Sequence, residues 1–176
     1  MVRLPKPEDA GRLAEIHVFG WRHAYGGIVP DTELFVDRTV AFQTKFWNQL
    51  LAQNAGEVLV FDDGIVKGFC IHGPCRDEDA SGAWEIQALY VEPAFLRQGV
   101  GTALLGPAEV AARERGCSRI LIWALERNPL GPPFYVRRGY APDGAVKTID
   151  EWAGARELRF SKGVSFLQGV PDAQGF

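Results

Sequence analysis

The sequence has few cysteines and no long apolar run, and both features exclude classes of protein. Its three cysteines, Cys70, Cys75 and Cys117, form no CxxC pair and are odd in number, which argues against a disulfide framework and a structural zinc site. No segment approaches the roughly 18 apolar residues of a membrane span, and the first residues lack the apolar stretch of a secretory signal. We therefore expect a cytoplasmic protein with no metal centre and no membrane partner.

An excess of positive charge is also missing. The chain has 19 Lys and Arg against 22 Asp and Glu, for a formal net charge of -3. A protein that binds nucleic acid through bulk electrostatics is usually distinctly basic, so nucleic acid is not an expected partner. The 176 residues, 47% hydrophobic and 23% charged, are typical of one globular domain and unlike a disordered chain.

Helical and strand-like patterns alternate along the chain. Helical patterns span 7–18, 40–53, 99–115 and 129–138, and strand-like runs span 57–61, 65–71, 84–91 and 118–124. We predict an α/β (α+β) domain over residues 1–162, built around a mixed sheet, followed by a loosely ordered tail over 163–176. Strict alternation in 84–91 places Glu85 and Leu89 on one face of the strand and Tyr90 on the other.

A glycine-rich turn joins the strand that ends at Val91 to the helix that begins near Gly99. Inward-pointing N–H groups in such a turn, with the partial positive charge of a helix N-terminus, suit a phosphate or diphosphate. Gly99 and Gly101 would let the backbone approach the anion closely. A Gly-x-Gly by itself is more often only a turn, and Leu104 stands where a dinucleotide fingerprint has its third glycine. A different nucleotide-binding α/β protein is therefore one alternative.

Two motifs in order make the signal more specific. Leu89-Tyr90-Val91 with Gln98-Gly99-Val100-Gly101-Thr102 resembles motif A of the GCN5-related N-acetyltransferases (GNAT), and Pro133-Phe134-Tyr135 after Asn128 resembles their motif B. Asn128 and Tyr135 are seven residues apart, as is usual in that family. Trp21 to Tyr25 resembles the N-terminal helix and loop of many bacterial members. The resemblance extends from about residue 8 to residue 160.

The resemblance implies a splayed mixed sheet and transfer of an acetyl group from acetyl-CoA to a primary amine, directly and in a ternary complex. It implies cofactor contacts at Leu89, Tyr90, Val91, Arg97, Gln98, Gly99, Val100, Gly101, Thr102 and Asn128. A cap or turn role is the alternative for Asn128. The same fold without turnover, as a CoA-binding sensor, is the alternative function.

The sequence departs from the family pattern in three places. Leu96 stands where Arg or Gln is usual, which predicts weaker side-chain help in holding the phosphates. Pro107 falls inside the predicted helix and predicts a bend there. Gly131-Pro132 replaces the small and polar residues usual between the two motif B positions, which predicts a changed wall of the thiol channel.

Acetyl transfer to an amine needs a base for the ammonium, donors for the thioester oxygen and an acid for the departing thiolate. The resemblance implies Glu85 as base, with Glu126 as a second candidate, and Tyr135 as acid. The alternatives are that Glu85 is solvated or pairs with an arginine, and that Tyr135 is only an aromatic packed at the sheet edge. A main-chain N–H near Leu89 would polarise the carbonyl.

The acceptor pocket is the least defined part of the prediction. Trp21 and Tyr25, four residues apart, could border it or could be core aromatics. The acidic run Asp77-Glu78-Asp79 could attract a cationic amine or be an ordinary solvated loop. The acceptor class stays open between small amines and protein N-termini or lysines, and pairing of C-terminal strands could make a homodimer.

Overall fold

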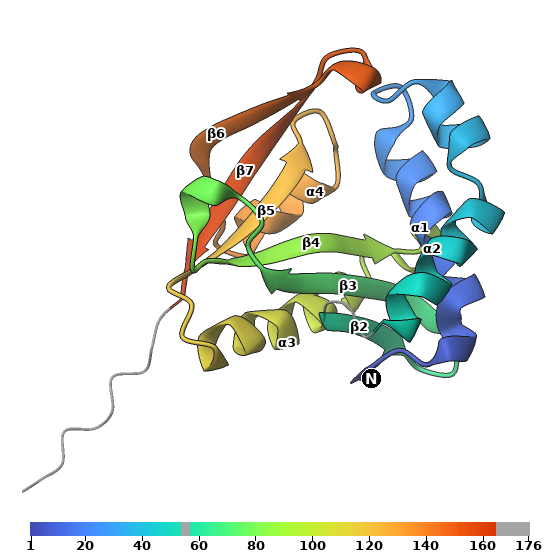
Figure 1. The fold of residues 1–176 in the computed structure, drawn as a ribbon, viewed down its shortest axis with the longest axis horizontal. Helices are drawn as coiled ribbons and strands as arrows, with labels where there is room; N and C mark the ends of the chain where they lie inside the picture. Colours follow the sequence, from blue (N-terminus) through green and yellow to red (C-terminus); the bar gives the residue numbers. More distant parts are fainter. Residues whose placement is uncertain (54–56, 165–176) are drawn as a thin grey trace, which may run out of the picture.

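Seven strands form one mixed sheet in this computed structural model, which describes residues 1–53 and 57–164. The strand order is β1-β2-β3-β4-β5-β7-β6 (Figure 1). The strands are β1 (Val2–Arg3), β2 (Glu57–Asp62), β3 (Val66–Pro74), β4 (Trp84–Val91), β5 (Arg119–Leu125), β6 (Ala141–Ile149) and β7 (Ala155–Gly163). The pair β4–β5 is parallel and the other neighbouring pairs are antiparallel, so the predicted mixed sheet is confirmed.

Helices cover both faces of the sheet. They are α1 (Ala10–Tyr25), α2 (Val40–Ala52), α3 (Val100–Glu114) and the short α4 (Gly131–Arg137). Apolar residues of α1 and α2 pack on one face of β2 and β3, whereas α3 packs on the other face of β3 and β4 (Figure 1). Side chains along β3 alternate between the two helical layers. Phe69 and Ile71 pack with the apolar residues of α1 and α2, and Cys70 packs with those of α3.

The sheet splits between β4 and β5. The two strands pair at Trp84–Ile120, Glu85–Leu121 and Ile86–Ile122, and then diverge (Figure 1). Their carboxyl-terminal halves therefore bound an open wedge, the place where α/β sheets commonly bind ligands. The splayed sheet predicted from the sequence is confirmed.

A β-bulge in β4 makes one sequence prediction wrong. His72 pairs with Ile86 and Ile71 with Ala88, which leaves Gln87 as an extra residue on β4. An extra residue reverses the alternation of side chains beyond it. The β4 side chains that pack on the α3 side are Trp84, Ile86, Leu89 and Val91. Glu85 consequently faces away from Leu89, toward the α1 side of the sheet.

Two further boundaries differ from the predicted ones, and the bend at Pro107 stays a prediction. α1 continues to Tyr25, beyond the predicted end at 18, so Trp21 and Tyr25 lie on one helix. Pro107 lies inside α3, which runs without interruption from Val100 to Glu114. The tail predicted from residue 163 starts inside β7, and residues 165–176 lie outside the described residues.

Two global features bear on partners. β6 is the last strand of the sheet and is largely exposed, so the homodimer expected through a C-terminal strand stays a prediction. Among the helices of the described ranges, none has both the length and the apolar composition that crossing a bilayer requires.

Buried His17 makes the stability of the fold depend on pH. Its ring lies among aromatic rings, 5.0 Å from Tyr90 and 5.4 Å from Phe69 between centroids, and burial lowers its pKa from 6.5 to about 4. Between pH 6.5 and about 4, the unfolded chain therefore binds a proton at His17 that the native state does not bind. The resulting stabilisation is complete above pH 6.5 and is lost as the pH falls toward 4.

Between neutral pH and pH 4, the free energy of unfolding should fall by about 2 to 3 kcal/mol less in His17→Phe than in the wild type. Each unit of pKa shift corresponds to about 1.4 kcal/mol. Urea unfolding of both proteins near neutral pH and near pH 4 measures it. His23→Gln, an exposed change on the same helix, is the control and should leave the wild-type slope unchanged. An equally steep slope in His17→Phe would show that other groups cause the acid sensitivity.

Candidate active site

A cavity of about 1010 Å³ opens where β4 and β5 diverge, at the upper end of the range for ligand pockets. The predicted site residues that line it are Trp21, Tyr25, Glu85, Leu89, Tyr90, Val91, Arg97, Gly99, Val100, Gly101, Thr102, Asn128 and Tyr135. Gln98 is the exception, since it is exposed and its side-chain amide donates to the Ala94 carbonyl at 3.2 Å. The fold thus brings four separate sequence windows to one place.

The turn before α3 presents a row of unused donors. The Leu96 N–H donates to Pro93 and the Ala103 N–H to Gly99, whereas the six N–H groups of 97–102 have no acceptor among the described residues. Arg97 and Gly99 both adopt left-handed backbone, with φ of 61° and 84°, which turns the chain sharply into the helix. Unused amides at the positive end of a 15-residue helix are an arrangement that commonly holds an anion in proteins.

The β4 edge beside the wedge is free from the bulge onward. Its pairing with β5 ends at Ile86, so Gln87 to Val91 are hydrogen-bonded as a strand on the β3 side alone. This stretch lines the cavity along its length. An extended ligand could pair with it as an added strand.

Tyr135 and Asn128 meet at the start of α4. Tyr135 is 7% exposed, and its hydroxyl has no hydrogen-bond partner among the described residues. Burial raises the pKa of this phenol above its usual value of 10, so the group keeps its proton at neutral pH. Asn128 Oδ1 accepts from the Leu130 N–H at 2.9 Å, which is the turn role given above as one of its alternatives. A Cβ on Gly131 would lie 3.1 Å from Asn128 Nδ2 and 3.4 Å from the Tyr135 ring, so glycine permits this close packing.

Aromatic side chains form the wall on the α1 side. The hydroxyls of Tyr25 and Tyr90 are 2.9 Å apart, and burial raises the pKa of Tyr25 to about 12. Trp21 packs edge-on against Tyr25 at 5.3 Å and against Trp152 at 5.2 Å between ring centroids. Trp21 and Tyr25 belong to a core cluster and also line the cavity, and their contact with the acceptor stays a prediction.

Glu85 is bound to an arginine, one of the alternatives that the sequence left open. Its Oε1 accepts from Arg76 Nη2 at 2.6 Å and its Oε2 from Arg76 Nε at 2.9 Å and the Arg76 N–H at 3.2 Å. Glu85 is 2% exposed, so it is not a solvated strand residue. Glu126, the second candidate base, pairs with Arg156 at 3.1 Å and is not part of the cavity wall.

Glu157 is a cavity residue that sequence reasoning missed. It lies on β7, paired with Leu125 of β5 and Lys147 of β6. Its carboxylate makes no hydrogen bond or ion pair with a described residue, and burial raises its pKa above the usual 4.5. The alternation with apolar Leu158 and Phe160 was visible in the sequence, but the pairing that carries Glu157 to the cavity was not.

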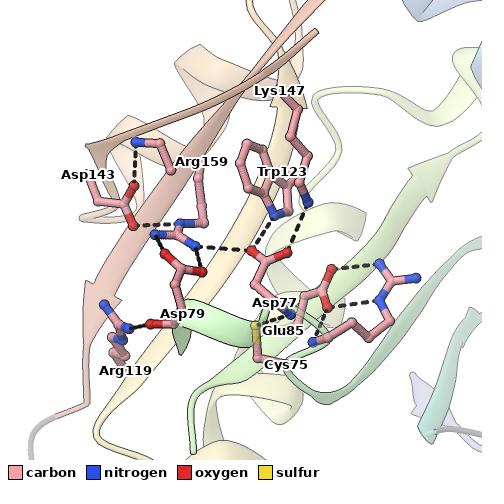
Figure 2. A network of polar contacts seen from close by, with 11 residues as sticks. Cys75, Asp77, Asp79, Glu85, Arg119, Trp123, Asp143, Lys147 and Arg159 are labelled. Carbon is pink, nitrogen blue, oxygen red and sulfur yellow. Dashed lines mark hydrogen bonds and ion pairs between the residues drawn. The ribbon is translucent and has the colours of Figure 1, made fainter. Parts of the chain in front are cut away.

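A network of ion pairs fixes the loop between β3 and β4 to the far half of the sheet (Figure 2). Arg159, 6% exposed, donates to Asp77 at 3.1 Å, to Asp79 at 2.7 Å and to Asp143 at 2.8 Å. Asp77 also accepts from Trp123 at 2.7 Å. Asp77 and Asp79 therefore tie this loop to β7, although Glu78 and Asp79 are exposed to solvent as the alternative for the acidic run expected. Within 1–53 and 57–164, no three metal-ligating side chains are grouped to hold an ion.

Comparison with known proteins identifies relatives along most of the chain. The model of the acetyltransferase (GNAT) family matches residues 13–140. The N-acetyltransferase YuaI of Bacillus subtilis, which is itself uncharacterized, is 33% identical over 156 residues, covering 88% of this chain and 87% of that protein.

Solved structures share the fold. The PaiA N-acetyltransferase of Thermoplasma acidophilum, in complex with coenzyme A, matches with a TM-score of 0.70 at 20% identity, over 90% of this chain and 96% of that one. The yncA protein of Salmonella typhimurium, solved with its cofactor acetyl-CoA, matches with a TM-score of 0.69 at 17% identity, over 99% and 98%. On the family match, the YuaI identity and the splayed fold, the chain belongs to the GNAT acetyltransferase family.

Proposed function

We propose that this protein is an acetyl-CoA-dependent N-acetyltransferase that moves the acetyl group directly to a primary amine in a ternary complex. The observation that carries the proposal is the row of six unused N–H groups at 97–102, which opens into the cavity at the N-terminus of α3. The relatives solved with coenzyme A and acetyl-CoA support the choice of ligand.

The residues present fit the parts of acetyl-CoA. The amides of 97–102 would hold the diphosphate, with Arg97 beside it and Leu96 giving no ionic help. The free edge from Leu89 to Val91 would pair with the pantetheine arm, and Asn128, whose Nδ2 has no acceptor among the described residues, would add a side-chain donor. The thiol end would then lie near Tyr135.

The same geometry assigns tasks to the chain's own groups. The bulge at Gln87 disturbs the ladder with β3 just before Leu89, which supports the proposed use of a main-chain N–H there to polarise the thioester carbonyl. Tyr135 would supply a proton to the departing sulfur. The predicted base, Glu85, faces the acceptor side, but Arg76 occupies both of its oxygens, so its use as a base requires that ion pair to open.

Release of thiol from acetyl-CoA by the purified protein, screened over primary amines, tests the function. We expect amine-dependent release with equal formation of acetylamine. Binding of acetyl-CoA without release for any amine would favour the CoA-binding sensor. Displacement of coenzyme A by adenine nucleotides alone would favour the nucleotide-binding alternative.

We expect Gly99→Ala to weaken binding of coenzyme A about tenfold. Left-handed backbone costs a residue with a Cβ about 1 to 2 kcal/mol, and relief of that strain would turn the amides away from the diphosphate. Calorimetric titration with coenzyme A measures the change. Gly106→Ala is the matched control, because Gly106 lies within α3 with nothing near its Cβ position, and should keep the wild-type affinity. Equal affinities for coenzyme A in the two variants would show that the N–H groups of 97–102 do not bind the diphosphate.

A further inference from the structure

We propose that Glu157 is the carboxylate that binds the ammonium group of the acceptor and takes its proton, and that the acceptor is a monocationic primary amine with an apolar body. This inference rests on the proposed acetyl transfer and names the substrate class of that same site. It goes beyond the sequence prediction, which assigned the proton to Glu85.

The charges at the acceptor end leave one carboxylate unpaired. Arg76 and Glu85 form an ion pair at 2.6 Å, and Lys147 pairs with Asp77 at 2.9 Å. Glu157 faces this group from β7 without a hydrogen bond or ion pair of its own to any described residue. A half-buried carboxylate that makes no ion pair of its own can be matched by a ligand with one positive charge.

The cavity that Glu157 lines also has aromatic walls. Glu157 pairs across the sheet with Leu125, which belongs to the same apolar cluster as Trp21 and Tyr25. Trp21, Tyr25 and Trp152 all line the cavity. Such faces attract the ammonium group and bury an apolar substituent next to it. A small dication or a strongly acidic amine would fit this wall less well.

Glu157 is also better placed than Glu85 to change its protonation state. Glu85 accepts three N–H donors from Arg76 and is 2% exposed, so a proton could reach it only after those bonds break. Burial favours the neutral form of Glu157, and the charged groups that face it are Lys147, Arg76 and Glu85, with the Tyr25 phenol nearby. A base must be able to hold a proton during the reaction, and Glu157 meets that requirement.

The proton balance closes without another reactant. Glu157 takes one proton from the ammonium, and the free amine forms the N–C bond to the acetyl group while the C–S bond breaks. The sulfur takes the Tyr135 proton, and the second proton of the attacking nitrogen returns to the Tyr135 oxygen. Glu157 then gives its proton to solvent. The products are the acetylamide, the thiol and one proton.

The experiment compares two acceptors of one shape, 2-phenylethylamine and its β,β-difluoro analogue, whose fluorines lower the ammonium pKa. For Glu157→Gln we expect kcat/KM with 2-phenylethylamine to fall roughly 10²-fold near neutral pH, the size of a general base. The loss should shrink as the pH approaches the pKa of the amine, because the free amine needs no base. The difluoro analogue, largely neutral already, should lose far less.

Controls separate this effect from folding and from charge. Glu157→Gln should keep the wild-type affinity for coenzyme A and the wild-type unfolding temperature. Glu151→Gln removes an exposed carboxylate from the β6–β7 connection and should keep the wild-type rate with both amines.

Each failure has its own signature. A pH-independent loss, or the same loss with both amines, would overturn the role of Glu157 as base while leaving the acetyltransferase standing. The pH-dependent pattern in Glu85→Gln and not in Glu157→Gln would overturn it in favour of the sequence prediction. A wild type that prefers dications would overturn the acceptor class. If the wild-type protein releases no thiol from acetyl-CoA with any amine, the proposed function is refuted, and this inference is refuted with it.

Discussion

Tyr135→Phe is expected to lower kcat roughly 10³-fold, within the range for loss of a general acid. The hydroxyl of Tyr135 has no hydrogen-bond partner among the described residues, Tyr135 lines the cavity, and burial raises the pKa of its phenol. Removing it leaves the sulfur to depart as an unprotonated thiolate. Affinity for coenzyme A should be little changed, because the ring stays in place and the diphosphate lies elsewhere.

The pH profile adds a second criterion. A phenol whose pKa is raised above 10 stays protonated through neutral and mildly alkaline pH, so Tyr135 should impose no alkaline limb below that value. The loss in Tyr135→Phe should therefore be constant over this range when kcat is measured at saturating amine. Tyr140→Phe is the matched control, since that hydroxyl donates to Glu109 at 2.9 Å and lies outside the cavity wall. Wild-type turnover in Tyr135→Phe with bound coenzyme A would refute the acid role.

Arg159→Leu is expected to destabilise the protein by about 3 kcal/mol, the lower end of the cost of breaking a buried ion pair. The change leaves Asp77 and Asp143 without their guanidinium in a partly buried site, while exposed Asp79 adds little. For a chain of this length the unfolding temperature should fall by about 6 to 12 °C. Differential scanning calorimetry measures it.

Arg156→Leu provides a stringent comparison for that result. Arg156 lies on the same strand and pairs with Glu126 at 3.1 Å, but at the surface, where an ion pair contributes about 0 to 1 kcal/mol. Arg159 lowers the pKa of Asp79, and with Lys147 and Trp123 it lowers the pKa of Asp77, so its stabilisation is present above pH 3.8 and is lost as the pH falls below that value. Equal costs for the two substitutions, or an Arg159→Leu cost that persists in strong acid, would contradict a buried charge network.

Most local elements and the sharp turn before α3 were predictable because each depends on neighbouring residues. The strand predicted over 84–91 has the same bounds as β4, and Gly99 is left-handed where the turn requires it. The windows around Gly99 and Tyr135 also meet as the family resemblance implies. Their catalytic roles stay predictions that the variants above test.

What the sequence could not give depends on pairing between distant strands. The bulge at Gln87 exists because β3 and β4 pair in two registers, and no local pattern in 84–91 marks the change. The partner of Glu85 was left open between water and an arginine, because Arg76 belongs to a loop with no periodicity. Glu157 looked like any polar strand residue until its strand was placed beside β5.

The extra residue in β4 also sets a counting rule for anyone who wishes to redesign this strand. Up to residue 86, the side chain at the odd-numbered position points toward the α1 layer. From residue 88 onward, the side chains at even-numbered positions do so. A mutational library that assumes one alternation along the whole strand would place some of its intended α1-side substitutions in the packing against α3. Deleting the codon for Gln87 would remove the extra residue and restore one regular alternation along the strand, with Leu89 and Val91 still on the α3 side.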